Sequence, residues 1–213
     1  MRYHTVLFDL DGTLIDHFAA IERSHVHAMR QLGLPAPTSE QVRASVGGGL
    51  ELAISRLAGP EHVAAVLAAY QPYWEATMLD DVKLLPGARE LLSAIKAAGA
   101  KTAVFTNKHG PSSRRICAHL GITRLLDGNF GATDTTWLKP SREFAGHVLR
   151  ALQAVPETTA LVGDSIYDLA TAKNAGLDFF GVTTGTHTAD ELRAAGATRV
   201  YPDLATLGAS LMR

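Results

Sequence analysis

Cysteine is almost absent from this chain, and its scarcity excludes two kinds of site. The single Cys117 among 213 residues cannot form an internal disulfide or build a cysteine-rich zinc site. Long apolar runs are also missing, because no stretch approaches the roughly 20 residues needed to cross a bilayer. The first apolar run is short and ends in acids, unlike a signal peptide. We therefore expect a cytoplasmic protein with no membrane partner.

The chain also lacks an excess of charge of either sign. Lys and Arg together number 20, against 21 for Asp and Glu. No basic surplus is available to attract nucleic acid electrostatically, so nucleic acid is not expected as a partner. A hydrophobic content of 46% in a chain of this length can bury a sizeable core. Either one domain or a large domain carrying a smaller one is compatible with this length, and so is a monomer or a homodimer.

The stretch from Asp9 to Leu14 directly follows an apolar run, Val6 to Phe8, and predicts a buried strand that ends in a turn. Period-two alternation places the carboxylates of Asp9 and Asp11 on one side. Two unit charges about 4 Å apart repel by roughly 4 kcal/mol at an effective dielectric near 20. Such a pair must share a proton or recruit a cation, so the turn indicates a metal site. On these residues alone, an ordinary polar turn is an equal alternative.

The remaining chain divides into a helical block and an alternating block. Helical patterns precede residue 80 at Phe18 to Leu32, Thr38 to Val46, Leu50 to Leu57 and Glu61 to Met78, with no strand expected among them. Strands and helices then alternate: strands at 101–106, 130–132, 159–163, 179–182 and 199–201; helices at 88–98, 112–120, 141–152, 168–175 and 189–195. Alternation of this kind predicts an α/β fold with a doubly wound, parallel sheet. We expect a core domain of residues 1–15 and 82–213, interrupted by a helical cap domain of residues 16–81.

Polar residues follow several of the predicted strands. In an open α/β sheet, ligands bind beyond the carboxyl ends of the strands. Besides the first turn, these positions hold Thr106 with Asn107, and Asp164 followed by Asp168; Lys139 lies just before a helix. Each has a plainer interpretation, as a helix cap or as a solvated surface lysine. Taken together, they predict one site at the edge of the sheet.

These segments resemble the four motifs of the haloacid dehalogenase superfamily of phosphohydrolases, in the order typical of the family. The motifs are Asp9-Leu10-Asp11-Gly12-Thr13-Leu14, Thr106, Lys139-Pro140, and Gly163-Asp164-Ser165-x-x-Asp168. The position of the helical block, with Thr106-Asn107-Lys108 and Lys139-Pro140, is most similar to the phosphoglycolate phosphatase-like branch. The resemblance implies a Rossmann-like core and a Mg²⁺-dependent phosphatase that forms an aspartyl phosphate.

The resemblance also implies a role for each motif residue. Asp9 is the expected nucleophile, and Asp11 the general acid and base. Mg²⁺ is expected on Asp9, the Asp11 backbone carbonyl and Asp164, with Asp168 in support. Phosphate contacts are expected from Thr13, Thr106 and Asn107, and Lys139 is expected to balance charge on Asp9 and the phosphate.

The helical block adds weaker candidates. Gly47-Gly48-Gly49 is the best candidate for a cap loop that approaches the ligand, because its bare backbone permits close contact; a plain helix break is the rival interpretation. Family members often carry serine where this chain has His17, which is a candidate to face substrate. A packing or surface role is as well supported for His17, and for His25 and His27.

The expected substrate is a small phosphate ester, with phosphoglycolate as the leading example by resemblance. Alternatives within the superfamily are a β-phosphoglucomutase-like phosphomutase, a pyrophosphatase and a nucleotidase. The mutase is less favoured because a cap histidine near Ile21 and a Lys-Gly-x-Ser-Arg stretch are missing. Outside enzymes, a catalytically silent binding module is the alternative.

Overall fold

The computed structural model describes residues 2–213, and the apolar strand before the first turn lies near the middle of its sheet. This strand, β1 (Thr5–Phe8), is buried on both faces, as a central strand of a parallel sheet must be. Six strands run parallel in the order β5-β4-β1-β6-β7-β8. The other five are β4 (Lys101–His109), β5 (Gly128–Ala132), β6 (Thr159–Gly163), β7 (Asp178–Val182) and β8 (Val200–Tyr201). The predicted doubly wound parallel sheet is confirmed.

Helices cover both faces of the sheet because successive residues of β1 point to opposite sides. Phe8 packs in one apolar cluster with α5 (Ala88–Ala97), α6 (Gly110–His119) and α10 (Leu204–Leu211). Leu7 packs in a second cluster with α7 (Arg142–Leu152) and α8 (Ile166–Ala175). Helix α9 (Ala189–Ala194) packs near the β8 edge. Short 3₁₀ turns occupy Pro60–His62, Thr123–Leu125 and Pro156–Thr158.

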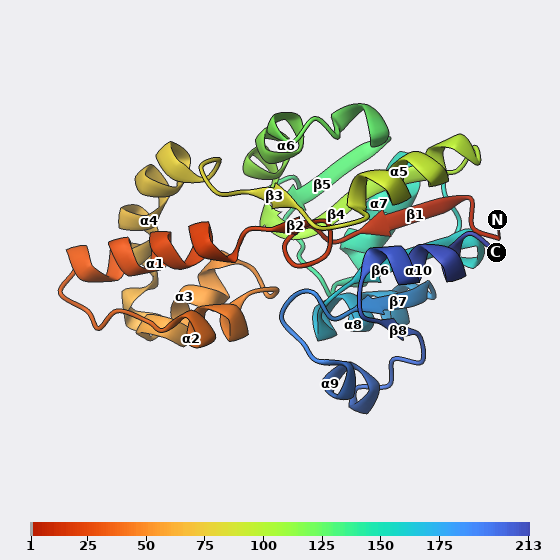
Figure 1. Ribbon diagram of the computed structural model, residues 1–213. Helices are drawn as coiled ribbons and strands as arrows, with labels where there is room; N and C mark the ends of the chain where they lie inside the picture. The colour runs from red at the N-terminus through yellow and green to blue at the C-terminus, as the bar shows by residue number, and fades with distance from the viewer. Residues whose placement is uncertain (1) are drawn as a thin grey trace.

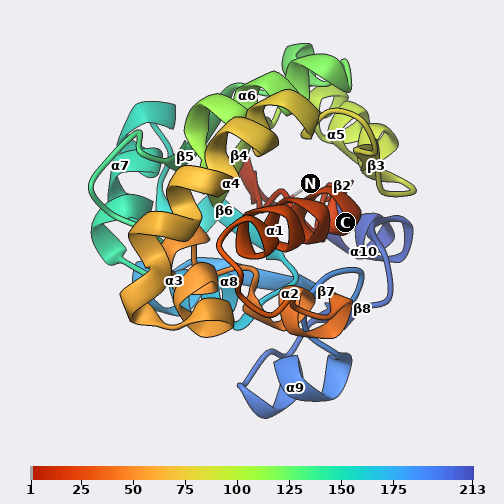
Figure 2. The same ribbon diagram turned by 90° about the vertical axis from the view of Figure 1, so that its left-hand side faces the viewer.

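Four of the five α-helices between β1 and β4 form a separate layer beyond the carboxyl edge of the sheet, on the left of Figure 1. They are α1 (Phe18–Gln31), α2 (Ser39–Ser45), α3 (Leu50–Ala58) and α4 (Val63–Thr77). Helix α2 begins where the sequence predicts, because Thr38 and Gln41 form a reciprocal capping box. Figure 2 shows α1 and α4 lying in front of the strand ends. We refer to these four helices as the helical cap.

The helical cap and the sheet are joined by a small feature that the sequence does not reveal. Strand β2 (Ile15–Asp16) pairs antiparallel with β3 (Lys83–Leu84), at the two places where the chain crosses between the layers. The expectation of no strand in this block is therefore wrong at its first residues. Strands of two residues show no periodicity, so no sequence pattern marks them.

Two further differences concern the end of the chain and the start of α8. Helix α10 lies where no element was predicted, and its Asp203 caps it by accepting from the Thr206 amide. Helix α8 begins two residues before the predicted Asp168, because Ser165 is its N-cap. Ser165 caps this helix by accepting from the Asp168 amide.

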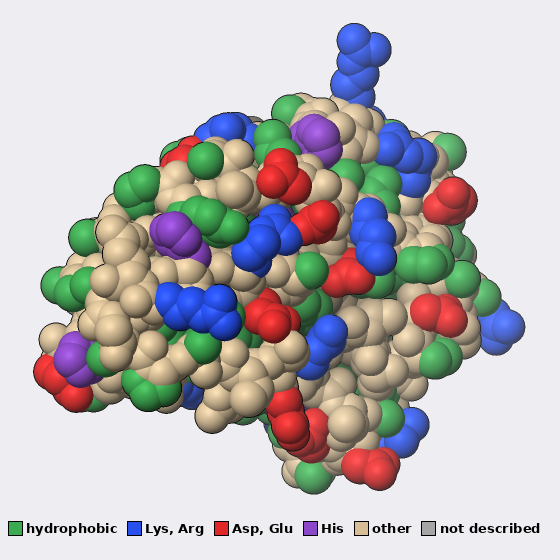
Figure 3. All heavy atoms as spheres, turned by 60° about the vertical axis from the view of Figure 1, so that its left-hand side comes forward, with side chains coloured by type: hydrophobic (Ala, Val, Ile, Leu, Met, Phe, Trp, Pro, Cys, Tyr) green, Lys and Arg blue, Asp and Glu red, His purple; other side chains and the backbone are tan. Residues whose placement is uncertain are grey.

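The surface agrees with the balanced composition. On the face drawn in Figure 3, basic and acidic side chains alternate over the surface without gathering into a patch of one sign. Across residues 2–213, none of the helices has the length and apolarity required to cross a membrane.

Candidate active site

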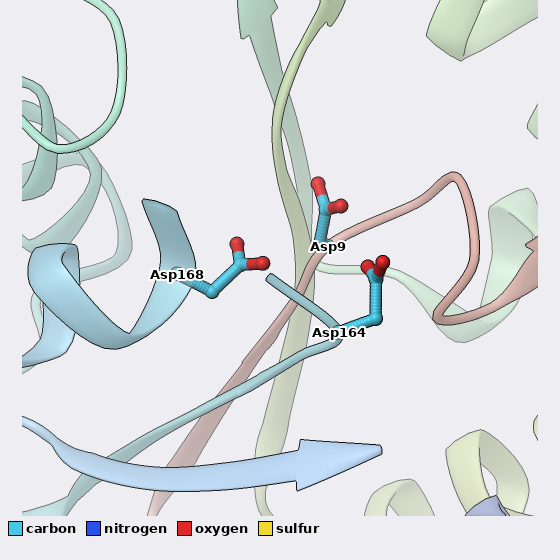
Figure 4. A group of neighbouring side chains, drawn as sticks. All are labelled: Asp9, Asp164 and Asp168. Atoms are coloured by element: carbon cyan, nitrogen blue, oxygen red, sulfur yellow. The ribbon is translucent and has the colours of Figure 1, made fainter. Parts of the chain in front are cut away.

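Three carboxylates converge where neighbouring strands end. Phe8 pairs with Val162, so the residues that follow these two positions lie side by side at the carboxyl edge. Asp9 comes from the end of β1, Asp164 from the turn after β6, and Asp168 from the first turn of α8 (Figure 4). One oxygen of each carboxylate lies within 4.8 Å of the others, and all three residues are buried.

Lys139 inserts its ammonium group between two of these carboxylates. Its Nζ donates to Asp9 Oδ1 at 2.8 Å and to Asp168 Oδ1 at 2.5 Å, and its side chain is 2% exposed. Burial alone would lower the pKa of Lys139, but the charges of Asp168 and Asp9 outweigh burial and raise it above its usual range. Lys139 is therefore a buried, ionised partner of the acids rather than a solvated surface lysine.

The protein alone does not neutralise the three acids. Burial raises the pKa of Asp9 to about 6, with Lys139 opposing the shift and Asp168 adding to it. Burial and then the charges of Asp9 and Asp168 raise the pKa of Asp164 to about 7. One lysine among three acids leaves a net negative charge in a buried space, which is the electrostatic condition for binding a cation.

Asp11 lies apart from this group, with its carboxylate turned toward the helical cap. Lys108 Nζ donates to both of its oxygens, at 3.0 and 2.9 Å, and also lies 4.5 Å from the centre of the Trp74 ring. His17 Nδ1 lies 3.4 Å from Asp11 Oδ1. Burial would raise the pKa of Asp11, but Lys108 and His17 outweigh it and hold that pKa below its usual range. The two acids of the first motif thus have opposite electrostatic surroundings.

His17 connects Asp11 to the second crossing between cap and core. Its Nε2 donates to the backbone oxygen of Met78 at 2.6 Å, and the residue is 1% exposed. His17 therefore lies against Asp11. It is not among the residues that line the cleft described below. His25 does line that cleft, and burial lowers its pKa to about 4. His27 is exposed and stacks on Tyr73, outside the cleft.

Asp164 is held by a loop that the sequence analysis did not single out. Thr186 donates to Asp164 Oδ2 through its amide at 2.8 Å and through its hydroxyl at 2.9 Å. Thr13 Oγ1 donates to Asp164 Oδ1 at 3.0 Å, so its hydroxyl orients an acid rather than facing the cleft. Thr184 Oγ1 donates to the Gly12 oxygen at 2.6 Å. This loop follows β7, so inspection of that strand's end would have identified it.

Gly185 permits the close approach of this loop, because a side chain there would overlap the Asp164 carboxylate. We expect Gly185→Ala to destabilise the protein by about 1–3 kcal/mol, as overpacking does, and to weaken divalent metal binding because Asp164 must move. Gly146→Ala is the control: it lies in helix α7, where alanine is favoured, and its new methyl group would meet only the Arg150 side chain. Thermal unfolding and metal titration measure both effects. A Gly185→Ala protein with wild-type metal affinity would contradict this role.

Asn107 joins the core motifs to the helical cap. Its Nδ2 donates to the Gly47 and Lys139 oxygens, each at 3.0 Å, and its Oδ1 accepts from the Lys139 amide at 2.7 Å. The Asn107 side chain is therefore engaged in positioning Lys139 and the glycine loop. Thr106 is 2% exposed, lines the cleft, and its hydroxyl oxygen accepts from the Lys108 amide.

The glycine loop of the cap, Gly47 to Gly49, lies against the core. Side chains at Gly47 or Gly48 would meet the Tyr167 ring of α8, so the bare backbone allows this approach. Arg43 of α2 also donates to the Gly185 oxygen at 2.9 Å. The cap is thus in contact with the same loops that hold the acids.

A cleft of about 830 Å³ lies between the carboxyl edge of the sheet and the helical cap. Its floor includes Asp9, Asp11, Thr106 and Asn107. Its opposite wall comes from α1, from the glycine loop with α3, and from α4. The volume is within the usual range for small-molecule sites, and the position at the strand ends is where α/β sheets bind ligands.

The model of the family described as "Haloacid dehalogenase-like hydrolase" matches residues 6–182, which include every motif named above. The chain belongs to this family. The family match confirms the resemblance drawn from the motifs.

Named relatives of the family extend over nearly the whole chain. "Probable phosphatase IndB" of Dickeya dadantii is 36% identical over 89% of this chain and 85% of its own length. A 5'-nucleotidase of Pseudomonas aeruginosa is 31% identical, covering 97% and 95%. A phosphoglycolate phosphatase of Vibrio cholerae is 29% identical, covering 95% and 94%. The crystal structure of "Putative haloacid dehalogenase-like hydrolase" from Bacteroides fragilis matches with a TM-score of 0.91 at 27% identity, covering 96% and 99%.

Proposed function

We propose that this hydrolase is a Mg²⁺-dependent phosphatase that cleaves small-molecule phosphate monoesters through an aspartyl phosphate on Asp9. The observation that supports the proposal most is the placement of Asp9 and Asp11 on the floor of one cleft, with Lys139 bonded to the first and Lys108 to the second. We assign residues 1–15 and 82–213 to the catalytic core. Residues 16–81 form the cap domain over the cleft.

In the first step, an Asp9 oxygen attacks phosphorus, and the bond from phosphorus to the ester oxygen breaks. Asp11 donates a proton to that departing oxygen, because the arrival of a phosphate anion raises its pKa and lets it carry one. Lys139 lies within hydrogen-bond distance of Asp9 and balances charge as the phosphoryl group arrives. Thr106, on the floor of the cleft, is placed to contact a phosphate oxygen.

In the second step, Asp11 takes a proton from water, which attacks phosphorus and releases phosphate from Asp9. The contacts of Asp11 with Lys108 and His17 favour its ionised form, which is the form that accepts a proton. A residue that first donates and then accepts must be poised in this way.

The acids fit a magnesium ion. Asp9, Asp164 and Asp168 offer buried oxygen ligands within 4.8 Å of one another, with no cysteine or histidine in that group. Oxygen donors are what Mg²⁺ prefers, whereas zinc sites use cysteine and histidine. When bound, the ion supplies charge neutralisation for the phosphoryl group, which otherwise repels an attacking carboxylate.

Chelation tests the proposal directly. Removing divalent metal is expected to abolish turnover of phenyl phosphate, and Mg²⁺ is expected to restore it. Full turnover after exhaustive chelation would contradict the assignment. Calcium, which tolerates looser and larger coordination, is expected to restore far less activity.

Mg²⁺ is expected to raise Tm much more at pH 8 than at pH 5.5. The metal-free pKa values of Asp9 and Asp164, about 6 and about 7, exceed those of an unfolded chain, so the metal-free protein loses stability as pH rises through this window. The same acids must be deprotonated to bind metal. At about 100 times its Kd, the ion adds roughly 2.7 kcal/mol. Equal shifts in Tm at both pH values would contradict the ligand assignment.

A further inference from the structure

The wall of the cleft that faces Asp9 and Asp11 is largely apolar. It is formed from the cap and from the loop before Lys139, and its hydrophobic side chains are Ile21, Val46, Leu50, Leu52, Leu67, Tyr70, Trp74 and Leu138. Leu52 and Leu138 are 39% and 38% exposed, and both lie at this one cleft. Exposed apolar groups at the rim of a cleft are typical of a surface that a ligand covers.

Positive charge is nearly missing from the same wall. Among the described residues that line the cleft, Lys108 is the one lysine or arginine, and both oxygens of Asp11 already accept from it. Glu51 and Glu75 add negative charge, although Glu75 is paired with Arg115. The remaining polar groups are uncharged, chiefly Gln71 and the threonines after β5.

Two histidines also line the cleft. His25 is buried against Tyr70, and burial lowers its pKa to about 4, so it is neutral near pH 7. His109 is exposed on the core side, and its Nδ1 is hydrogen-bonded to the Ser112 hydroxyl at 3.0 Å. A second anion on the substrate would therefore leave water for a space that offers it no free lysine or arginine, which costs free energy.

We propose that the alcohol released by this enzyme is uncharged and has a flat, largely apolar face, as in an aromatic alcohol or a nucleoside. The inference rests on the proposed phosphatase activity and narrows its substrate. It disfavours phosphoglycolate, whose carboxylate would face Glu51 and the leucines of the wall. The volume of the cleft also exceeds what so small an ester would fill, whereas a ring system reaches the apolar wall.

A matched pair of esters tests the charge preference. Phosphoglycolate and 2-hydroxyethyl phosphate are similar in size but differ in a carboxylate. We expect kcat/KM to be at least roughly tenfold higher for 2-hydroxyethyl phosphate than for phosphoglycolate, and higher again for phenyl phosphate and uridine 5'-monophosphate. Phenyl phosphate and uridine 5'-monophosphate distinguish an aromatic alcohol from a nucleoside, since the first has only a ring and the second adds a ribose. A higher kcat/KM for phosphoglycolate than for all three would overturn the inference.

Substitution of one leucine in the wall tests the contact. Leu67 lies on α4, one turn before Tyr70 and two turns before Trp74, and it lines the cleft. Leu67→Asn is expected to lower the ratio of kcat/KM for phenyl phosphate to that for 2-hydroxyethyl phosphate by roughly tenfold. Leu57→Asn is the matched control, since Leu57 is equally half-buried in the cap but does not line the cleft. In Leu57→Asn the ratio of the two kcat/KM values should stay at the wild-type value. An equal fall of this ratio in both variants would contradict a contact between Leu67 and the substrate.

Binding of inert analogues separates this inference from the proposed function. Calorimetry with the Mg²⁺-loaded wild-type enzyme would compare benzylphosphonate with phosphonoacetate, neither of which has a phosphate ester bond to cleave. Tighter binding of benzylphosphonate supports the inference that the alcohol is uncharged, even if no ester is hydrolysed. A lack of ester hydrolysis would contradict only the phosphatase assignment. Tighter binding of phosphonoacetate overturns the inference even where every ester is hydrolysed.

Discussion

Replacing Asp9 with asparagine is expected to abolish turnover while the protein stays folded. Asparagine keeps the shape of the side chain but removes the attacking oxygen, so the loss in kcat should be at least about 10⁴-fold. Asp9 is buried among like charges, and its pKa is raised to about 6, so a neutral side chain relieves repulsion. Tm measured without metal should be unchanged or higher.

A control variant shows whether the effect is specific to Asp9. Asp16 is a half-buried acid seven residues after Asp9, and its carboxylate pairs with Lys83 at 3.4 Å. Asp16→Asn should leave kcat near the wild-type value. A radiolabelled aryl phosphate, quenched with acid, should leave label on the wild-type protein and none on Asp9→Asn. Retention of more than a few per cent of wild-type kcat would show that another residue is the nucleophile.

Lys139→Met is expected to damage both stability and catalysis. Methionine preserves the length and apolar stem of the side chain but leaves Asp9 and Asp168 without their buried cation. Removal of one member of a buried ion pair typically costs about 3–5 kcal/mol, because the remaining charge is uncompensated. Turnover should fall by at least roughly 10³-fold, since the ammonium group also balances the incoming phosphoryl charge.

Lys83→Met provides the comparison for this variant. Its Nζ pairs with Asp16 at 3.4 Å, but the side chain is 71% exposed, and exposed pairs contribute about 0–1 kcal/mol. Urea unfolding of both variants, with and without Mg²⁺, measures the difference. If Lys139→Met unfolds at the same urea concentration as Lys83→Met in the absence of metal, the buried ion pair does not have the stabilising role described here.

The core of the fold could be predicted because its signals are local. Val6 to Phe8 is apolar without interruption and ends in acids and glycine, so its strand and its turn are both marked in the sequence. Asp164 also follows an apolar run, so it is expected at the same edge of the sheet as Asp9, because parallel strands share a direction. The structure brings Asp9, Asp164, Asp168 and Lys139 together as this reasoning requires.

Other parts of the site depend on contacts between residues far apart in the chain, for which the sequence has no periodic signal. Thr186 reaches Asp164 only because the loop after β7 folds back over the turn after β1. The pairing of Lys108 with Asp11 spans 97 positions, and that of His17 with Met78 spans 61. The hydrogen bond from the Thr13 hydroxyl to Asp164 is a further contact of this kind, because the position of Thr13 in the motif does not indicate it.

The pairing of β2 with β3 makes the helical cap separable from the core in an evolutionary and engineering sense. Ile15 lies opposite Leu84, and Asp16 opposite Lys83, so the chain leaves the core and returns to it at adjacent positions. Residues 17–82 therefore connect β2 and β3 as a very long hairpin loop. The entropic cost of closing a loop rises only slowly with its length. A cap of different size or pocket chemistry could therefore be exchanged at this ribbon as a cassette, leaving the acids and their lysine in place.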